Sequence, residues 1–134
     1  MSTENLLRSF GPRLTYAVAS FVVGASGAVP AASTWRGSNK GAFTVTRSGA
    51  GQYTVVWDQR YKGNLVHVNV MARVGATSGN PTITQSVAVG LPDRAQAGAT
   101  ARTVKFSTLT SGAVADLASG SEITVELVFS GPQS

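Results

Sequence analysis

The sequence predicts an all-β protein, a single antiparallel β-sandwich of the jelly-roll or Greek-key type with about seven to eight strands. Short runs in which apolar and polar residues alternate recur about every dozen residues, as they do in sandwiches. Turns rich in glycine, proline and asparagine separate these runs, and no segment keeps a helical period. The 134 residues are enough for one domain with a core of its own.

The clearest element is a hairpin over residues 43–57. Phe43 and Val45 alternate with threonines before a glycine-containing turn, and Tyr53 and Trp57 share a face after it. A turn of this length that contains glycine joins adjacent antiparallel strands, so we expect the other strands to be arranged around this hairpin.

Residues 13–23 form the first predicted strand, and both of its faces are largely apolar. The stretch is too short and too polar to span a membrane, and its interrupting polar residues favour a strand over a signal peptide. Two apolar faces need cover on both sides, which we expect from a second sheet and from another subunit. One face carries Tyr16, Val18 and Ser20, and the other carries Ala17, Ala19, Phe21 and Val23.

Further strands are predicted at residues 65–74, 82–89, 102–109 and 122–129. The first of these has the longest clean alternation in the chain, so successive side chains are expected on opposite faces. The core face is predicted to hold Val66, Val68, Val70, Ala72 and Val74, and the outer face Leu65, His67, Asn69, Met71 and Arg73.

The chain divides into an N-terminal arm, residues 1–12, and one β-sandwich domain, residues 13–134. The arm is polar apart from a small apolar patch formed by Leu6, Leu7 and Phe10. An arm of this kind is either disordered or docked on a neighbour, where it orders on binding.

Composition excludes several kinds of chemistry. The chain has no cysteine, which removes disulfides, thiolate catalysis and cysteine-ligated zinc. The formal net charge is +5, but the basic residues are scattered singly, so we do not expect a nucleic-acid partner. Charged residues make up only 13%, which leaves serine, threonine, glycine and amides to form the polar surface, as in β-rich virion or extracellular proteins.

No pattern of residues indicates an enzyme active site, a metal site or a cofactor site. The only histidine, His67, lies in mid-strand without the partners that a metal site or a catalytic triad needs. Glu122 and Glu126 share the outer face of the last strand but are too far apart for an obvious carboxylate dyad. The glycine-rich stretches match no phosphate-binding loop and are predicted to be turns.

Residues 41–55 contain a Gly-x-Gly-x-Tyr-Thr-Val run that begins at Gly49 and precedes a polar turn and a long strand. The chain closes with Thr103-Val104-Lys105-Phe106, a Ser-Gly-Ala-Val-Ala-Asp loop that ends at Asp116, and an alternating strand. In this order the motifs resemble the small β-rich structural proteins of tailed bacteriophages. The resemblance covers about residues 13 to 130 and consists of turn and strand motifs, without a catalytic signature.

The resemblance implies a virion protein, with a capsid decoration (cement) protein as the best-fitting role. Such a protein would bind the major capsid protein as a homotrimer on the outer surface of the head, after assembly in the bacterial cytoplasm. It would involve no membrane and no cofactor.

The contact residues of that family do not form a sequence motif, so we choose candidate contacts by the chemistry of the side chains in this sequence. Exposed apolar, aromatic and basic side chains are the natural candidates. Trp35 lies in a long connection and either covers the core or faces a partner. The expected capsid contacts are Leu6, Leu7, Phe10, Trp35, Arg36, Lys40, Arg60 and Lys62, and the expected oligomer contacts are Leu65, His67 and Met71.

Two other function classes stay open. A head- or tail-fiber receptor-binding module would present aromatic side chains at loop tips, with Trp35 and Tyr61 as candidates. A basic nucleic-acid-binding β-protein would show binding that weakens steeply with salt.

Overall fold

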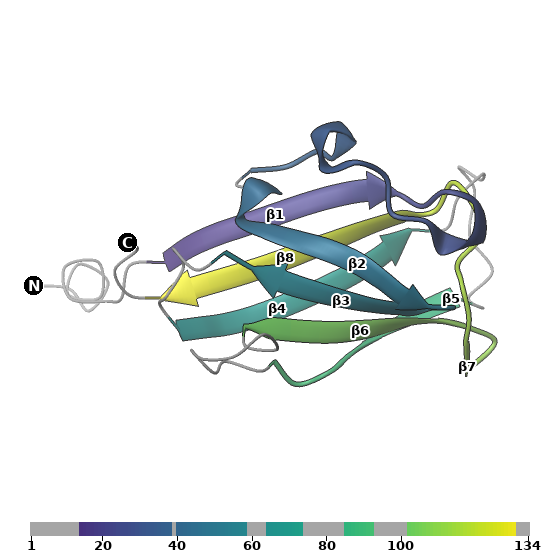
Figure 1. Ribbon diagram of the computed structural model, residues 1–134. Coiled ribbons are helices and arrows are strands. Elements are labelled where there is room, and N and C mark those ends of the chain that lie inside the picture. The colour runs from purple at the N-terminus through teal and green to yellow at the C-terminus, as the bar shows by residue number, and fades with distance from the viewer. Residues whose placement is uncertain (1–13, 39, 59–63, 74–84, 93–101, 131–134) are drawn as a thin grey trace, which may run out of the picture.

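The computed structural model describes residues 14–38, 40–58, 64–73, 85–92 and 102–130. Within these ranges the chain forms two antiparallel sheets that pack face to face as a sandwich (Figure 1), as the sequence predicts. Sheet A has the order β1 (Leu14–Val22), β8 (Glu122–Ser130), β4 (Asn64–Arg73). Sheet B has the order β2 (Phe43–Gly49), β3 (Gln52–Trp57), β6 (Thr103–Thr110), β5 (Gln85–Val89), and the short β7 (Ala113–Val114) pairs with β6.

The connectivity is of the Greek-key type. β3 and β6 are neighbours in sheet B, while β4 between them in sequence crosses to sheet A and lies against the edge strand β5. In the order β4, β5, β6, β3 around the sandwich, three consecutive strands are neighbours, and β3, the strand before them in the chain, lies beside the last of the three. The first and last strands, β1 and β8, also pair along their whole length, which joins the two ends of the described chain.

The core lies between the sheets and follows the predicted alternation. In the hairpin, Phe43 and Trp57 pair across β2 and β3, and both side chains are buried. The Tyr53 ring stacks on the Phe106 ring with centroids 4.9 Å apart, and Trp57 meets Phe129 edge-on at 6.2 Å. Such aromatic pairs add to the free energy of apolar burial, which explains why the hairpin anchors the core.

A connection of three single 3-10 turns closes one side of the sandwich. These turns are η1 (Ala25–Gly27), η2 (Ala32–Thr34) and η3 (Lys40–Ala42). Trp35 lies between η2 and η3 with 4% of its surface exposed, and its ring contacts Phe21 of β1 and Phe43 of β2. The tryptophan thus fills the gap between one edge of each sheet.

One part of the predicted pattern is wrong, at the start of β4. Leu65 is only 2% exposed and pairs with Phe129, whereas Val66 is 51% exposed. The register shifts between Leu65 and His67, because a β-bulge leaves Val66 without a partner on β8. Val66 is the extra residue and lies on the surface, and the bulge reverses the alternation of the residues before it, so Leu65 belongs to the core.

Candidate functional site

The outer face of sheet A is the surface that best fits a functional site. We call it the A-face. Pairing with β8 on both sides brings side chains of β1, β8 and β4 into rows across this face. Its members are Leu14, Tyr16, Val18, Ser20 and Val22 of β1, Glu122, Thr124, Glu126 and Val128 of β8, and His67, Asn69, Met71 and Arg73 of β4.

The β1 side of the A-face is an apolar row. Leu14, Tyr16 and Val22 are 45%, 50% and 54% exposed, and Val18 lies between them. Alternate residues of a strand are about 7 Å apart, so this row spans roughly 27 Å. The opposite face of β1 is buried in the core, as Ala17, Ala19 and Phe21 show. The predicted second sheet therefore covers one face of β1, and within the described part of the chain no further layer covers the other face.

The β4 side of the A-face is polar and contains an ion pair and a histidine–glutamate contact with β8. Arg73 Nη1 lies 2.7 Å from Glu122 Oε1 and 2.9 Å from the Thr124 hydroxyl. His67 Nε2 lies 3.4 Å from Glu126 Oε1. Both acids of the face thus have a basic partner on β4, and Met71, 47% exposed, lies between the two basic residues along the strand. The A-face thus offers apolar contact area beside the Arg73–Glu122 ion pair, while His67 balances the charge of Glu126 only when the imidazole is protonated.

Of the three expected oligomer contacts, the structure places two on this face. His67 and Met71 are exposed on β4, across β8 from the apolar row. Leu65 is in the core because of the bulge, so its expected place on the outer face is wrong. Tyr16 and Val22, which are slightly more exposed than Met71, were not among the expected contacts, although the two apolar faces of their strand were visible in the sequence.

The expected capsid contacts in the long connection have different environments. Trp35 is buried, and its indole Nε1 donates to the Pro30 carbonyl at 3.0 Å. Lys40 Nζ donates to the Trp35 carbonyl at 2.7 Å, so it holds the connection together. Arg36 is exposed, and its backbone pairs with Ser20 at the edge of β1. Only Arg36 of the three presents its side chain freely to a partner.

The burial of Trp35 also bears on the fiber alternative, because the tryptophan is core cover and not a loop-tip aromatic. The other candidate aromatic, Tyr61, lies outside the described residues. So do the remaining expected capsid contacts, Leu6, Leu7, Phe10, Arg60 and Lys62.

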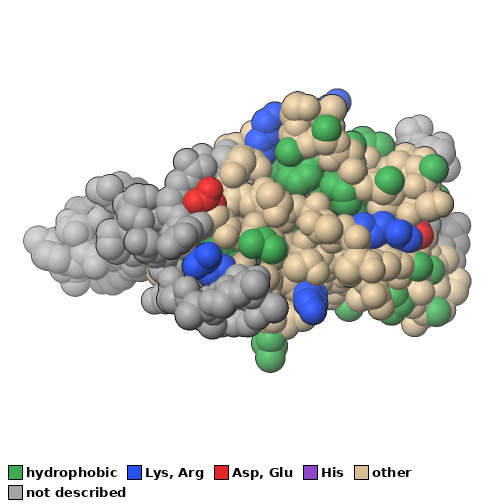
Figure 2. All heavy atoms as spheres, in the orientation of Figure 1, with side chains coloured by type: hydrophobic (Ala, Val, Ile, Leu, Met, Phe, Trp, Pro, Cys, Tyr) green, Lys and Arg blue, Asp and Glu red, His purple; other side chains and the backbone are tan. Residues whose placement is uncertain are grey.

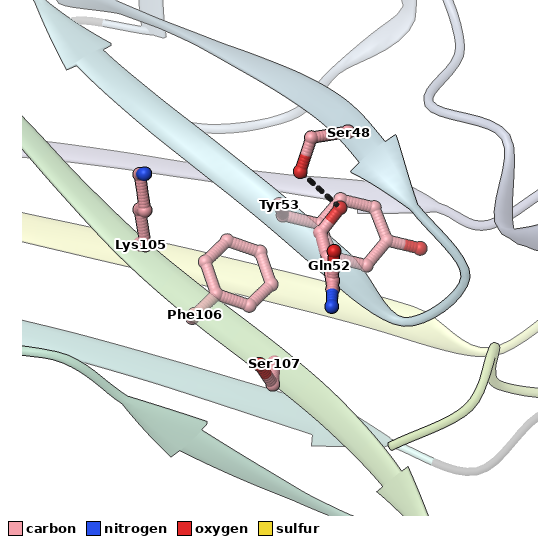
Figure 3. Close-up of a pocket in the computed structure, with 6 residues that line it drawn as sticks. All are labelled: Ser48, Gln52, Tyr53, Lys105, Phe106 and Ser107. Atoms are coloured by element: carbon pink, nitrogen blue, oxygen red, sulfur yellow. Dashed lines mark hydrogen bonds between the residues drawn. The ribbon is translucent and has the colours of Figure 1, made fainter. Parts of the chain in front are cut away.

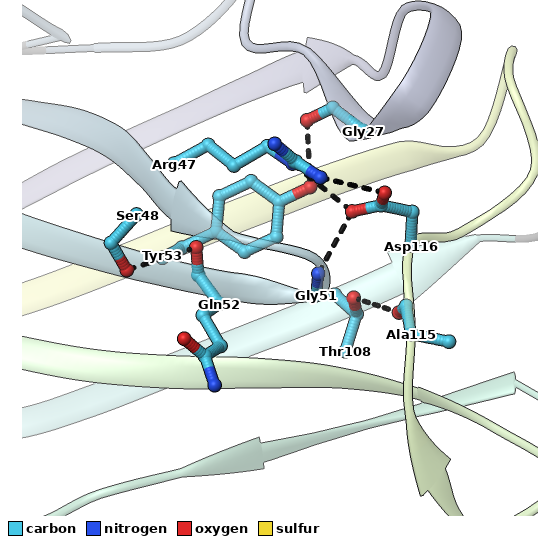
Figure 4. A network of polar contacts seen from close by, with 9 residues as sticks. All are labelled: Gly27, Arg47, Ser48, Gly51, Gln52, Tyr53, Thr108, Ala115 and Asp116. Carbon is cyan, nitrogen blue, oxygen red and sulfur yellow. Dashed lines mark hydrogen bonds and ion pairs between the residues drawn. The ribbon is translucent and has the colours of Figure 1, made fainter.

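Sheet B carries two further features, a shallow hollow on its outer face (Figure 3) and a polar network at the end of the β2–β3 hairpin (Figure 4). In the network, Arg47 forms a two-pronged pair with Asp116, with Nε 3.1 Å from Oδ1 and Nη2 2.8 Å from Oδ2. The Gly51 amide donates to the same Oδ1 at 2.8 Å. The Tyr53 hydroxyl donates to the Gly27 carbonyl at 2.8 Å. We call these five residues the clamp.

Electrostatics and backbone shape both stabilise the clamp. The hydrogen bonds from Arg47, with a further one from the Gly51 amide, hold the pKa of Asp116 below its ordinary value. Burial raises the pKa of the Tyr53 hydroxyl, so Tyr53 stays neutral at physiological pH. Gly27 has φ +72°, and a side chain there would collide with the Asp116 carboxylate and the Tyr53 hydroxyl. The clamp joins three segments that are distant in sequence.

The clamp explains the two motifs on which the phage resemblance is based. Arg47, Gly51 and Tyr53 come from the glycine-rich hairpin, and Asp116 ends the Ser-Gly-Ala-Val-Ala-Asp loop. These segments lie against each other in Figure 4. The motifs therefore encode a tertiary contact that stabilises the fold, which the sequence alone did not reveal.

Basic side chains do not gather into one surface on the face shown in Figure 2, where they stand as separate patches. Among the described residues, no group of three His, Asp or Glu side chains is placed to hold a metal ion. Within the same ranges the structure contains no apolar helix of membrane-spanning length. Comparison with protein families, with curated proteins and with solved structures finds no match to this chain.

Proposed function

We propose that the chain is a structural subunit of a virion, a decoration protein that binds the outer surface of a bacteriophage head and stabilises it. The observation that carries the proposal is the open apolar row of β1, Leu14, Tyr16, Val18 and Val22, on a strand whose other face is already buried. Exposed apolar side chains gathered on one face of a small domain, here interrupted by Ser20 alone, are typical of protein–protein contacts. The resemblance of the hairpin and loop motifs to phage structural proteins is the reason for proposing a phage head as the assembly.

In this proposal the A-face is the contact between copies of the chain, arranged as a homotrimer. The chain carries a net charge of +5, so copies repel unless they meet through a surface without excess charge. On the A-face Glu122 is paired with Arg73, and Glu126 lies beside His67, so this face carries no excess positive charge. The spare positive charge, for example at Arg36, lies elsewhere and suits an acidic capsid shell.

The function is tested with phage heads that lack the protein. We expect the purified chain to co-sediment with expanded heads and to raise the temperature at which they release DNA. Deletion of residues 2–12 is expected to weaken head binding at least tenfold without changing the oligomeric state, because the arm is assigned to the capsid contact. Equal head binding after the deletion would refute the role of the arm.

Failure of the full-length chain to bind heads at any salt concentration would contradict the decoration role itself. Retention on DNA that falls steeply with salt would favour the nucleic-acid alternative instead.

A further inference from the structure

The hollow on the outer face of sheet B has a volume of about 300 Å³ and is open to solvent. Tyr53 and Phe106 form its floor through their backbone, since their rings are buried in the core below. The side chains at its mouth are all polar. The lining residues are Ser48, Gln52, Tyr53, Lys105, Phe106 and Ser107 (Figure 3).

The polar side chains are held on rigid backbone. Gln52 pairs with Ser107 across β3 and β6. Lys105 lies two residues before Ser107 on β6, on the same face of the sheet. The Gly90 amide donates to the Lys105 carbonyl at 2.8 Å, which fixes β6 from its other side. Gly49 leaves room for the Gln52 side chain, because a Cβ at Gly49 would lie 3.0 Å from Gln52 Oε1. The group is thus preorganised by the sheet and not by a loop.

Lys105 differs electrostatically from the paired arginines Arg47 and Arg73. Arg47 and Arg73 are each paired with a carboxylate at 2.8 and 2.7 Å. Lys105 is exposed, and within the described ranges no acid is paired with it. Its charge is therefore available to an external anion, and the uncharged donors and acceptors of Gln52 and Ser107 lie beside it.

We propose that this hollow binds the carboxylate-bearing ring of an acidic saccharide, such as a uronic acid. The carboxylate would lie at Lys105 Nζ, and ring hydroxyls would exchange hydrogen bonds with Gln52, Ser107 and Ser48. A saccharide fits better than an acidic peptide, because a peptide with several carboxylates would find only one cation here. The inference does not depend on the proposed function, since the hollow lies on the opposite sheet from the A-face and stays open when the A-face is covered.

Affinity for a single ring is expected to be weak. The hollow is shallow, and Tyr53 and Phe106 are too deeply buried to stack on a sugar. We expect a Kd of about 1–10 mM for one site, which corresponds to roughly 3–4 kcal/mol. Any array that presents several copies of the site would raise the avidity for a polysaccharide well above this value.

The test is an NMR titration of the full-length protein with glucuronic acid, with glucose and acetate as matched controls. Glucose keeps the hydroxyls without the acid, and acetate keeps the carboxylate without the ring. We expect saturable shifts at the amides of residues 48, 52 and 105–107 with glucuronic acid, and at least tenfold weaker binding of each control. Lys105→Gln should abolish the shifts, and Arg36→Gln, which removes an exposed charge elsewhere, should leave them unchanged.

Three results would overturn the inference. The first is the absence of saturable shifts up to about 50 mM glucuronic acid. The second is acetate or a glutamate-rich peptide binding as well as glucuronic acid, which would indicate a simple anion or peptide site. The third is a Lys105→Gln protein that is folded, by its spectrum, and binds like the wild type.

Discussion

At the scale of single residues, the clamp is the most specific structure in the chain. Asp116 accepts hydrogen bonds from Arg47 and Gly51 and so connects the hairpin turn to the loop before β8. The pair is shielded on one side by the protein, with the Asp116 side chain 22% exposed. The Arg73–Glu122 pair has a similar distance, but its arginine is 54% exposed against 30% for Arg47, while the two carboxylates are similarly exposed. The contributions of the two ion pairs to stability can therefore be compared, with Arg47–Asp116 as the less exposed pair and Arg73–Glu122 as the more exposed one.

We expect Asp116→Asn to lower Tm at pH 7 by roughly 3–6 °C, because it removes charge-assisted hydrogen bonds that join distant segments. Glu122→Gln should change Tm by less than about 2 °C, since exposed ion pairs contribute little. Thermal unfolding followed by circular dichroism measures both. Equal shifts for the two variants would show that the clamp is no more than a surface contact.

The same pair gives a pH dependence with a definite sign. The pKa of Asp116 is lowered from 3.8 in the folded state, so its contribution is present above that value and is lost as pH falls through the folded pKa. The difference in Tm between wild type and Asp116→Asn should therefore be constant near neutral pH and shrink below about pH 4. A difference that persists unchanged in acid would contradict this assignment.

At the scale of elements, strand positions were largely predictable and their details were not. The predicted hairpin and the strands near residues 13–23 and 122–129 appear as β2–β3, β1 and β8. A periodicity of two is a local property that sequence reports directly. The bulge in β4 depends on pairing with β8, so the alternation of Leu65 and Val66 in sequence could not reveal it. Trp35 likewise became core cover only through contacts with two separate strands.

Because of the bulge, substitutions at the neighbouring residues Leu65 and Val66 should change the free energy of unfolding by different amounts. Leu65→Ala should destabilise the domain by about 2–4 kcal/mol, because it leaves a cavity against Phe129, while Val66→Ala should change the free energy of unfolding by less than about 0.5 kcal/mol. Urea denaturation measures both values. The reverse order would mean that the simple alternation holds and the bulge does not exist.

At the scale of the whole molecule, the sandwich has two unlike outer faces. The A-face combines an apolar row with the Arg73–Glu122 ion pair, and the outer face of sheet B is polar around Lys105. The sequence indicated that β1 is apolar on both faces, so the need for a second cover was predictable from residues such as Tyr16. It could not place His67 and Met71 across from that row, because this neighbourhood depends on β8 lying between β1 and β4.

The central claim is that the A-face joins copies of the chain, and its most direct test is the mass of the protein in solution by light scattering at several concentrations. We expect about three times the chain mass of 13.8 kDa for the wild type, independent of concentration. Val22→Lys should dissociate the assembly, since it puts a charge into the apolar row. Val56→Lys, at an exposed valine on the outer face of sheet B, should keep the wild-type mass. A wild-type monomer at every concentration, or a Val22→Lys protein with unchanged mass, would contradict the account.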